Sequence, residues 1–159
     1  MTTSTRPSFV YVTYIATTPQ KLWNALTDNE MIKDYWGRHR NVSDWKPGSR
    51  WEHQDYDNPK TIDIAGKIIE SKPPTKLVLT WSFPQDEGNP DKVSRVTFHI
   101  EPFMEQTKLT VTHEDLEPGS WMLKGISAGW PLVLAALKTL VETGKPVDCM
   151  TRRWEKPPE

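Results

Sequence analysis

The sequence predicts an α+β fold in which a curved antiparallel sheet of six to seven strands wraps around one long C-terminal helix. Runs of alternating apolar and polar residues follow one another between residues 8 and 114, which is typical of strands joined by hairpins. Residues 121–141 instead repeat apolar side chains every three or four positions, which indicates a single amphipathic helix. Two short helical patterns come directly after the first strand. A helix that follows such a sheet covers one of its faces and can leave a cavity between the two layers.

The N-terminal elements are marked by clear start and stop signals. Residues 8–15 are β-branched and aromatic, which favours a strand. Thr18 can cap a helix that begins at Pro19, because the first helical position needs no backbone N–H. Asn29 can cap a second short helix over residues 30–35. We therefore expect one strand and then two short helices.

Six further strands are predicted before the long helix. Turn sequences at 46–48 (Lys-Pro-Gly) and 73–74 (Pro-Pro) separate some of them, and Gly66 within one strand indicates a bulge or sharp bend. Gly144 is expected to end the long helix. The predicted strands cover residues 40–45, 49–56, 61–71, 76–83, 93–101 and 108–114.

Length and composition are those of one soluble domain. The chain has 159 residues, and 20 Lys and Arg balance 21 Asp and Glu, so no net field favours nucleic acid. The single cysteine, Cys149, excludes an intrachain disulfide. We expect one domain over residues 8–144 with flexible tails at 1–7 and 145–159, no signal peptide, no membrane span and a cytoplasmic location. No metal site and no cofactor are expected, because the metal-ligand and phosphate-loop patterns are missing.

Five segments carry a family likeness. They are residues 17–27 (TTPQKLWNALT), 66–70 (GKIIE) followed by 73–74 (PP), 77–81 (LVLTW), 109–113 (LTVTH) and 129–137 (GWPLVLAAL).

With this order of elements, the chain resembles the START-like (SRPBCC) superfamily, whose helix-grip fold is a curved antiparallel sheet around a C-terminal helix. Within it, the chain is similar to the single-domain proteins grouped with the activator of the 90-kDa heat-shock protein ATPase. The resemblance implies a cavity between sheet and helix, because members elsewhere in the superfamily bind lipids, steroids, polyketides or hormones there. It also implies a chaperone as a protein partner. It carries over no catalytic residue.

Two histidines are the polar side chains most suited to chemistry. His113 follows the period-two pattern of its strand, so it should face the helix-covered side of the sheet, and His53 shares a strand face with Trp51. A neutral imidazole there could hold a ligand or act as a general base. The alternative is a structural histidine that is hydrogen-bonded within the core.

Eight tryptophans are the compositional oddity of the chain. Bulky aromatic side chains on the concave face and on the helix could form an apolar wall with few polar groups, which suits a hydrophobic or aromatic small molecule. The alternative is a filled core in which the same rings pack on one another. The residues expected to line the cavity are Trp51, His53, Trp81, Phe98, His113, Trp121, Met122 and Trp130.

The sequence leaves three hypotheses for function. The first is binding of a hydrophobic or aromatic small molecule between sheet and helix. The second is a protein-partner module, either a stress-related chaperone cofactor or a homodimer that uses exposed apolar side chains. The third is an enzyme acting on a ring-bearing substrate, which requires His53 or His113 to face an open pocket.

Overall fold

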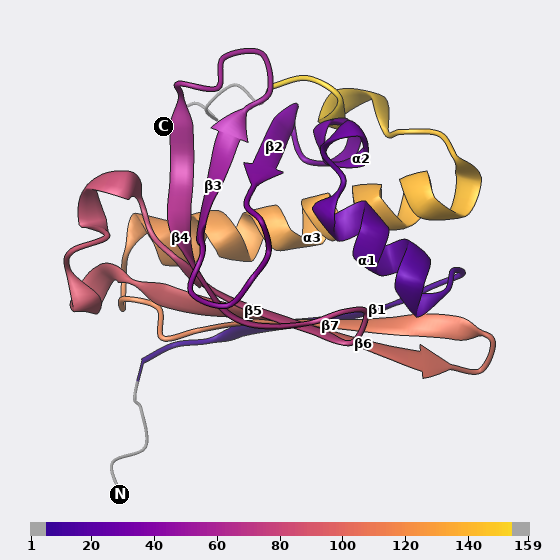
Figure 1. Cartoon of the computed structure of the whole chain (residues 1–159), viewed down its shortest axis with the longest axis horizontal. Coiled ribbons are helices and arrows are strands. Elements are labelled where there is room, and N and C mark those ends of the chain that lie inside the picture. Colours follow the sequence, from indigo (N-terminus) through magenta and orange to yellow (C-terminus); the bar gives the residue numbers. More distant parts are fainter. Residues whose placement is uncertain (1–5, 154–159) are drawn as a thin grey trace, which may run out of the picture.

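The computed structural model describes residues 6–153 and shows seven strands, three α-helices and three short 3₁₀ turns (Figure 1). The main elements are β1 (Phe9–Ile15), α1 (Pro19–Thr27), α2 (Asn29–Tyr35), β2 (His39–Val42), β3 (Arg50–Asp55), β4 (Ile62–Lys72), β5 (Lys76–Trp81), β6 (Ser94–Phe103), β7 (Gln106–Glu114) and α3 (Trp121–Thr143). Each predicted strand and helix is present. The predicted strand at 40–45 is shorter than expected and lies at 39–42.

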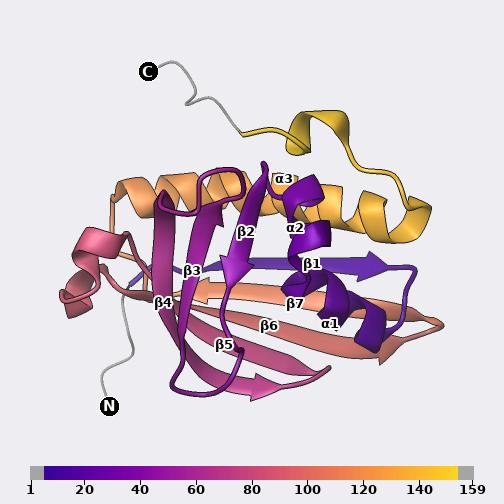
Figure 2. The same ribbon diagram turned by 45° about the horizontal axis from the view of Figure 1, so that its top comes forward.

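One antiparallel sheet holds all seven strands in the order β1-β7-β6-β5-β4-β3-β2. Strands β1, β7, β6 and β5 run beneath α3, and β4, β3 and β2 curl up along its side (Figures 1 and 2). Helices α1 and α2 lie beside the C-terminal half of α3. This curled sheet around a long helix is the helix-grip fold, as predicted.

The short helices begin almost as the sequence indicates. Thr18 caps α1 by accepting the backbone N–H of Lys21 at 3.2 Å, with Pro19 at the first position. Helix α2 is capped by Asp28 and not by Asn29. The Asn29 side chain instead accepts the backbone N–H of Asn41 at 2.8 Å and so ties α2 to β2.

Gly66 allows two strands and a tryptophan to meet in the core. Trp51 lies opposite Gly66 in the β3–β4 ladder, and its indole N–H donates to the carbonyl of Thr80 at 2.8 Å. A Cβ on Gly66 would lie 2.0 Å from that carbonyl oxygen. The strand pattern is therefore interrupted by glycine because the backbones and the indole approach too closely for a side chain.

The segment after α3 returns across the molecule towards β3 and β4. Met150 is buried, and its carbonyl accepts the backbone N–H of Gly37 at 2.9 Å. Arg153 pairs with Asp55 and, at 3.3 Å, with Asp63. Residues 148–153 of the tail expected to be flexible thus make defined contacts; residues 1–5 and 154–159 lie outside the described residues. Among residues 6–153, no helix is both long and apolar enough to cross a membrane.

Candidate functional site

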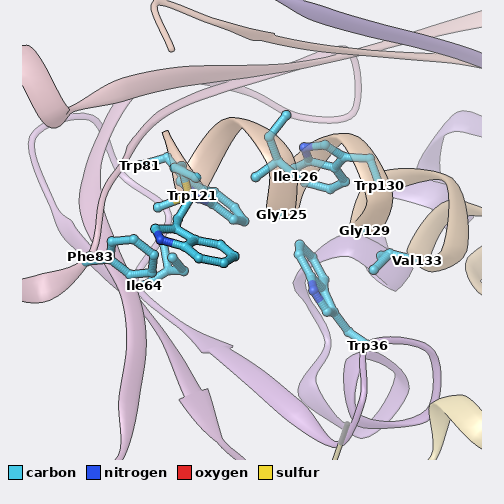
Figure 3. A pocket seen from close by; sticks show the side chains of 11 residues that line it. Trp36, Ile64, Trp81, Phe83, Trp121, Gly125, Ile126, Gly129, Trp130 and Val133 are labelled. Atoms are coloured by element: carbon cyan, nitrogen blue, oxygen red, sulfur yellow. The ribbon is translucent and has the colours of Figure 1, made fainter. Parts of the chain in front are cut away.

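A pocket of about 210 Å³ opens between the N-terminal half of α3 and the curled edge of the sheet (Figure 3). It is smaller than the roughly 300–1,000 Å³ of sites for drug-sized ligands, and its walls carry no charged side chain. Residues from α2's end, β4, β5 and α3 contribute to it. They are Trp36, Ile64, Trp81, Phe83, Trp121, Met122, Gly125, Ile126, Gly129, Trp130 and Val133.

Two glycines on α3 make room for this pocket. Gly125 and Gly129 are four residues apart, so they lie on the same face of the helix, one turn after the other. A Cβ added to either glycine would meet nothing within 4 Å. A glycine inside a helix costs about 1 kcal/mol relative to alanine. The helix thus accepts two unfavourable residues at the place where its surface borders open space.

Tryptophans form the walls around the glycines. Trp121 and Phe83 lie on one side of the opening, and Trp36 lies across from them (Figure 3). Trp36 stacks on Trp81 with ring centroids 6.4 Å apart and tilts against Trp130 at 5.4 Å. Trp121 is 79% exposed, although it is one of the largest apolar side chains. Such exposure places an uncovered aromatic surface at the mouth of an apolar pocket.

The indole N–H groups of the wall differ in their partners. Trp81 donates to the sulfur of Met122 at 3.2 Å, and Trp130 donates to His113 Nδ1 at 3.1 Å. The indole N–H of Trp36 has no acceptor among residues 6–153, although the ring borders the pocket. Trp36 therefore offers a hydrogen-bond donor to a molecule inside an otherwise apolar site.

A second hollow of about 210 Å³ adjoins the first beyond Phe83, Trp121 and Met122. It is more polar, since Asp86, Lys92, Glu117 and Ser120 border it. The exposed Trp121 ring lies between the two spaces. An occupant longer than the apolar pocket would pass from apolar into polar surroundings here.

His113 lies behind the pocket wall in a buried chain of hydrogen bonds. Trp130 donates to Nδ1 of the imidazole, so Nε2 carries the ring proton and donates to Ser94 Oγ at 2.7 Å. The Ser94 hydroxyl in turn donates to the carbonyl of Trp81 at 3.1 Å. Burial lowers the pKa of His113 to about 3, so the ring is neutral. This chain connects α3, β7, β6 and β5 and holds the two wall tryptophans in place.

His53 belongs to a second buried polar group, near the C-terminal segment. Its ring stacks on His39 with centroids 4.3 Å apart, and Nδ1 lies 2.6 Å from Asn41 Oδ1. His39 Nε2 lies 2.6 Å from the carboxylate of Asp63, and this hydrogen bond lowers the pKa of Asp63. Burial, together with the neighbouring His39, holds the pKa of His53 well below its usual range. Like His113, His53 is buried and hydrogen-bonded in the interior.

The structure divides the eight predicted site residues into two sets. Trp81, Trp121, Met122 and Trp130 line the pocket. Trp51 and Phe98 instead border an internal void of only about 10 Å³ behind Trp36 and Trp81. His53 and His113 do not line the pocket. Both are buried and hydrogen-bonded, which agrees with the alternative of histidines that serve the packing of the core.

Seven lining residues were not predicted from the sequence: Trp36, Ile64, Phe83, Gly125, Ile126, Gly129 and Val133. Ile64 and Phe83 carry no signal that separates them from core residues. Gly125 and Gly129 do carry one, since two glycines at helical spacing on the apolar face predict a hollow in the helix surface. Among residues 6–153, no cluster of three or more His, Cys, Asp or Glu side chains could hold a metal ion.

Known proteins of similar structure share this architecture. CalU16 from Micromonospora echinospora matches with a TM-score of 0.68 and 20% identity over 87% of this chain and 78% of that one. The Aha1 dimer from Colwellia psychrerythraea matches with a TM-score of 0.68 and 19% identity, over 87% and 98% of the two chains. PFC0360w, an HSP90 activator from Plasmodium falciparum, matches with a TM-score of 0.68 and 25% identity, over 87% and 97%. Among curated proteins, none matches the sequence.

The sequence itself matches the family model described as "Activator of Hsp90 ATPase homolog 1-like protein" over residues 16–142. This range includes every helix and strand from α1 to β7 and all but the last residue of α3. The chain therefore belongs to the family of Activator of Hsp90 ATPase homolog 1-like proteins.

Proposed function

We propose that this protein binds a small, uncharged, aromatic or otherwise hydrophobic molecule in the pocket beside α3. The observation that carries the proposal is the pair Gly125 and Gly129, which keeps the helix surface low at the point where tryptophans surround an open space. A cavity of about 150 Å³ is enough for benzene, so about 210 Å³ suits one or two rings.

The chemistry of the walls supports an uncharged occupant. A charged group placed among these side chains would lose its hydration without gaining a partner of opposite charge. A ring can stack or meet edge-to-face with Trp36 and Trp81. One oxygen on the ring can accept the indole N–H of Trp36, which has no acceptor among residues 6–153.

The test uses 2-naphthol as a probe and measures its affinity by calorimetry and by quenching of tryptophan fluorescence. We expect 2-naphthol to bind and 2-naphthoate, which has the same rings and a negative charge, to bind at least about tenfold more weakly. The Trp36→Phe variant should weaken 2-naphthol more than naphthalene, because it takes ring area from both probes but a hydrogen-bond donor from 2-naphthol alone.

A matched pair of helix variants locates the binding. Gly129→Leu places a side chain in the pocket and should abolish binding, whereas Ala128→Leu, on the exposed neighbouring position, should leave it unchanged. Absence of binding by the unmodified protein, or equal affinity in both leucine variants, would overturn the proposal.

A protein-partner role is the second candidate. The family description and the Plasmodium HSP90 activator support it. It predicts that the protein raises the ATPase rate of a 90-kDa heat-shock protein. An unchanged rate at saturating concentration would count against this role and leave the pocket proposal intact.

The enzyme hypothesis has less support from the site. It required His53 or His113 to face an open pocket, and both are buried among protein partners behind the wall. For each of these three functions, we propose that the protein is located in the cytoplasm.

A further inference from the structure

No strand or helix of the part of the chain that the structure describes covers the outer edge of β1 over most of its length. β1 lies at one end of the sheet and, within residues 6–153, pairs only with β7. Near its C-terminal end, the carbonyl of Tyr14 accepts Lys138 Nζ at 2.6 Å, and the N–H of Ala16 donates to Glu142 at 2.7 Å. Both contacts come from α3, so they identify the backbone groups that point away from β7.

The direction of backbone groups alternates along a strand, so Val10 and Val12 point the same way as Tyr14. The N–H and C=O groups of these two valines have no partner among residues 6–153 on that side. Their side chains are also uncovered, with Val10 56% and Val12 46% exposed. An apolar strand with a free row of backbone groups is a template for another strand.

The opposite edge of the sheet is protected. β2 has only four residues, and α2 lies beside it (Figure 2). The N–H of Asn41 is taken by the side chain of Asn29. β1 is longer, and between Phe9 and Ile15 it has neither a proline nor a charged residue. Of the two edges, β1 therefore lacks the devices that prevent strand addition.

We propose that two copies of the chain associate by antiparallel pairing of β1 with β1, about a twofold axis through Tyr11. In this register Val10 of each copy faces Val12 of the other, and the two residues exchange both backbone hydrogen bonds. A register centred on Val12 would pair Val10 with Tyr14, whose carbonyl Lys138 occupies, whereas with the axis at Tyr11 that carbonyl lies opposite only Ser8, outside the central Val10–Val12 pairs. A register centred on Val10 would place Val12 opposite the polar Ser8. This dimer is independent of the pocket, because no residue of β1 lines it.

The sequence around the axis favours a second copy as the occupant. The segment Val10-Tyr11-Val12 reads the same in both directions, so the twofold pairs equal side chains. The next row of the exposed face holds Thr112 and Thr110, which pair with Val10 and Val12 in the β1–β7 ladder. No like charges are brought together, and the exposed valines gain cross-strand contacts.

Cross-linking tests the register. Tyr11 would face its own copy as a non-hydrogen-bonded pair with Cα atoms about 4.5 Å apart, a distance that a disulfide can span. We expect Tyr11→Cys, in a Cys149→Ser background, to form a covalent dimer on mild oxidation, and Val12→Cys in the same background to form little. A dimer linked through Val12→Cys and not through Tyr11→Cys would overturn the register.

Light scattering over a wide range of protein concentration tests the dimer itself. We expect the unmodified protein to dimerise and Val12→Lys to weaken the dimer at least about tenfold, because it places two charges beside the axis. Val42→Lys, on the protected edge, is the matched control and should leave the dimer unchanged. Val10→Lys is the second variant, should Val12→Lys not fold by circular dichroism. The proposal would be overturned if the unmodified protein stayed monomeric, or if Val42→Lys alone disrupted the dimer.

Discussion

The pocket beside α3 and the hydrogen-bonded chain behind it share two tryptophans but differ in almost every other respect. On the pocket side, Trp81 and Trp130 face open space bordered by glycines and an exposed indole. On the other side, the same two residues meet His113 and Ser94, and each polar atom of that chain has a partner.

The difference shows how an apolar hollow can be kept open. Tryptophans that lined a cavity without other support could turn inward and fill it. Here Trp130 is held from behind by His113, and Trp81 is held by its bond to Met122, which itself lines the pocket. Buried hydrogen-bonded chains give a site fixed orientations, so a ligand does not have to order the wall itself. Changes on the packed side should therefore affect stability first, and changes on the pocket side should affect binding first.

The largest effect is expected at Gly66, in the packed core next to Trp51, whose ring lies against Trp81. Gly66→Ala forces a Cβ against the Thr80 carbonyl and the Trp51 indole. We expect the free energy of unfolding to fall by about 3 kcal/mol or more, as measured by urea denaturation. Gly88→Ala, where a Cβ meets nothing within 4 Å, is the control. Equal stability of the two variants would show that β4 and β5 separate easily.

His113 is expected to come next. His113→Ala leaves a cavity and removes the acceptor of Trp130, so we expect a loss of about 3 kcal/mol. Ser94→Ala removes one hydroxyl and should cost about 1 kcal/mol. If this chain of hydrogen bonds also supports the pocket wall, His113→Ala should weaken the binding of 2-naphthol as well. The affinity is measured at a temperature where the variant stays folded. Unchanged affinity would separate the two regions.

Acid should reveal the same residue without mutation. His113 has a pKa of about 3 in the fold and an ordinary value near 6.5 when unfolded. Between these values the unfolded chain binds the extra proton, so stability falls as the pH falls below about 6.5, by about 1.4 kcal/mol per pH unit for one histidine. His53, whose pKa is also lowered, acts in the same direction. Urea denaturation from pH 7 to pH 5 measures the slope, which should be reduced in His113→Gln. A flat profile would contradict the buried neutral ring.

The smallest change in stability, with the opposite sign, is expected on the pocket side. Gly129→Ala adds a Cβ into open space, and alanine favours the helix by about 1 kcal/mol. The variant should therefore be slightly more stable and bind 2-naphthol less well. Gly125→Ala should behave alike. A loss of stability in either variant would mean that this face of α3 is more closely packed than the hollow suggests.

Local sequence signals account for most of the fold. Alternating strands, the Thr18–Pro19 helix start and the long apolar period of α3 depend on neighbours within a few residues, and the structure confirms each. Asn29 shows the limit. It is a good cap by residue type, but its side chain is drawn to the backbone of β2, a contact that residue spacing does not reveal.

The site was predicted in part for the same reason. The sequence placed Trp81, Trp121, Met122 and Trp130 near a cavity, because period-two and helical patterns fix the face on which a side chain lies. It could not separate them from Trp51 and Phe98, which share those faces but lie deeper. Depth within a curved sheet depends on how the strands curl, and the curl is set by contacts between distant elements.

The sequence by itself thus determined the order of the elements, the faces of the sheet and helix, and the concentration of aromatic residues between them. Only the tertiary structure decided where that interior is filled and where it is hollow. It also decided which histidines are engaged and which sheet edge stays open. Local periodicity states which side of an element is apolar; packing between elements far apart in the chain determines whether that side meets another side chain, a ligand or a second molecule.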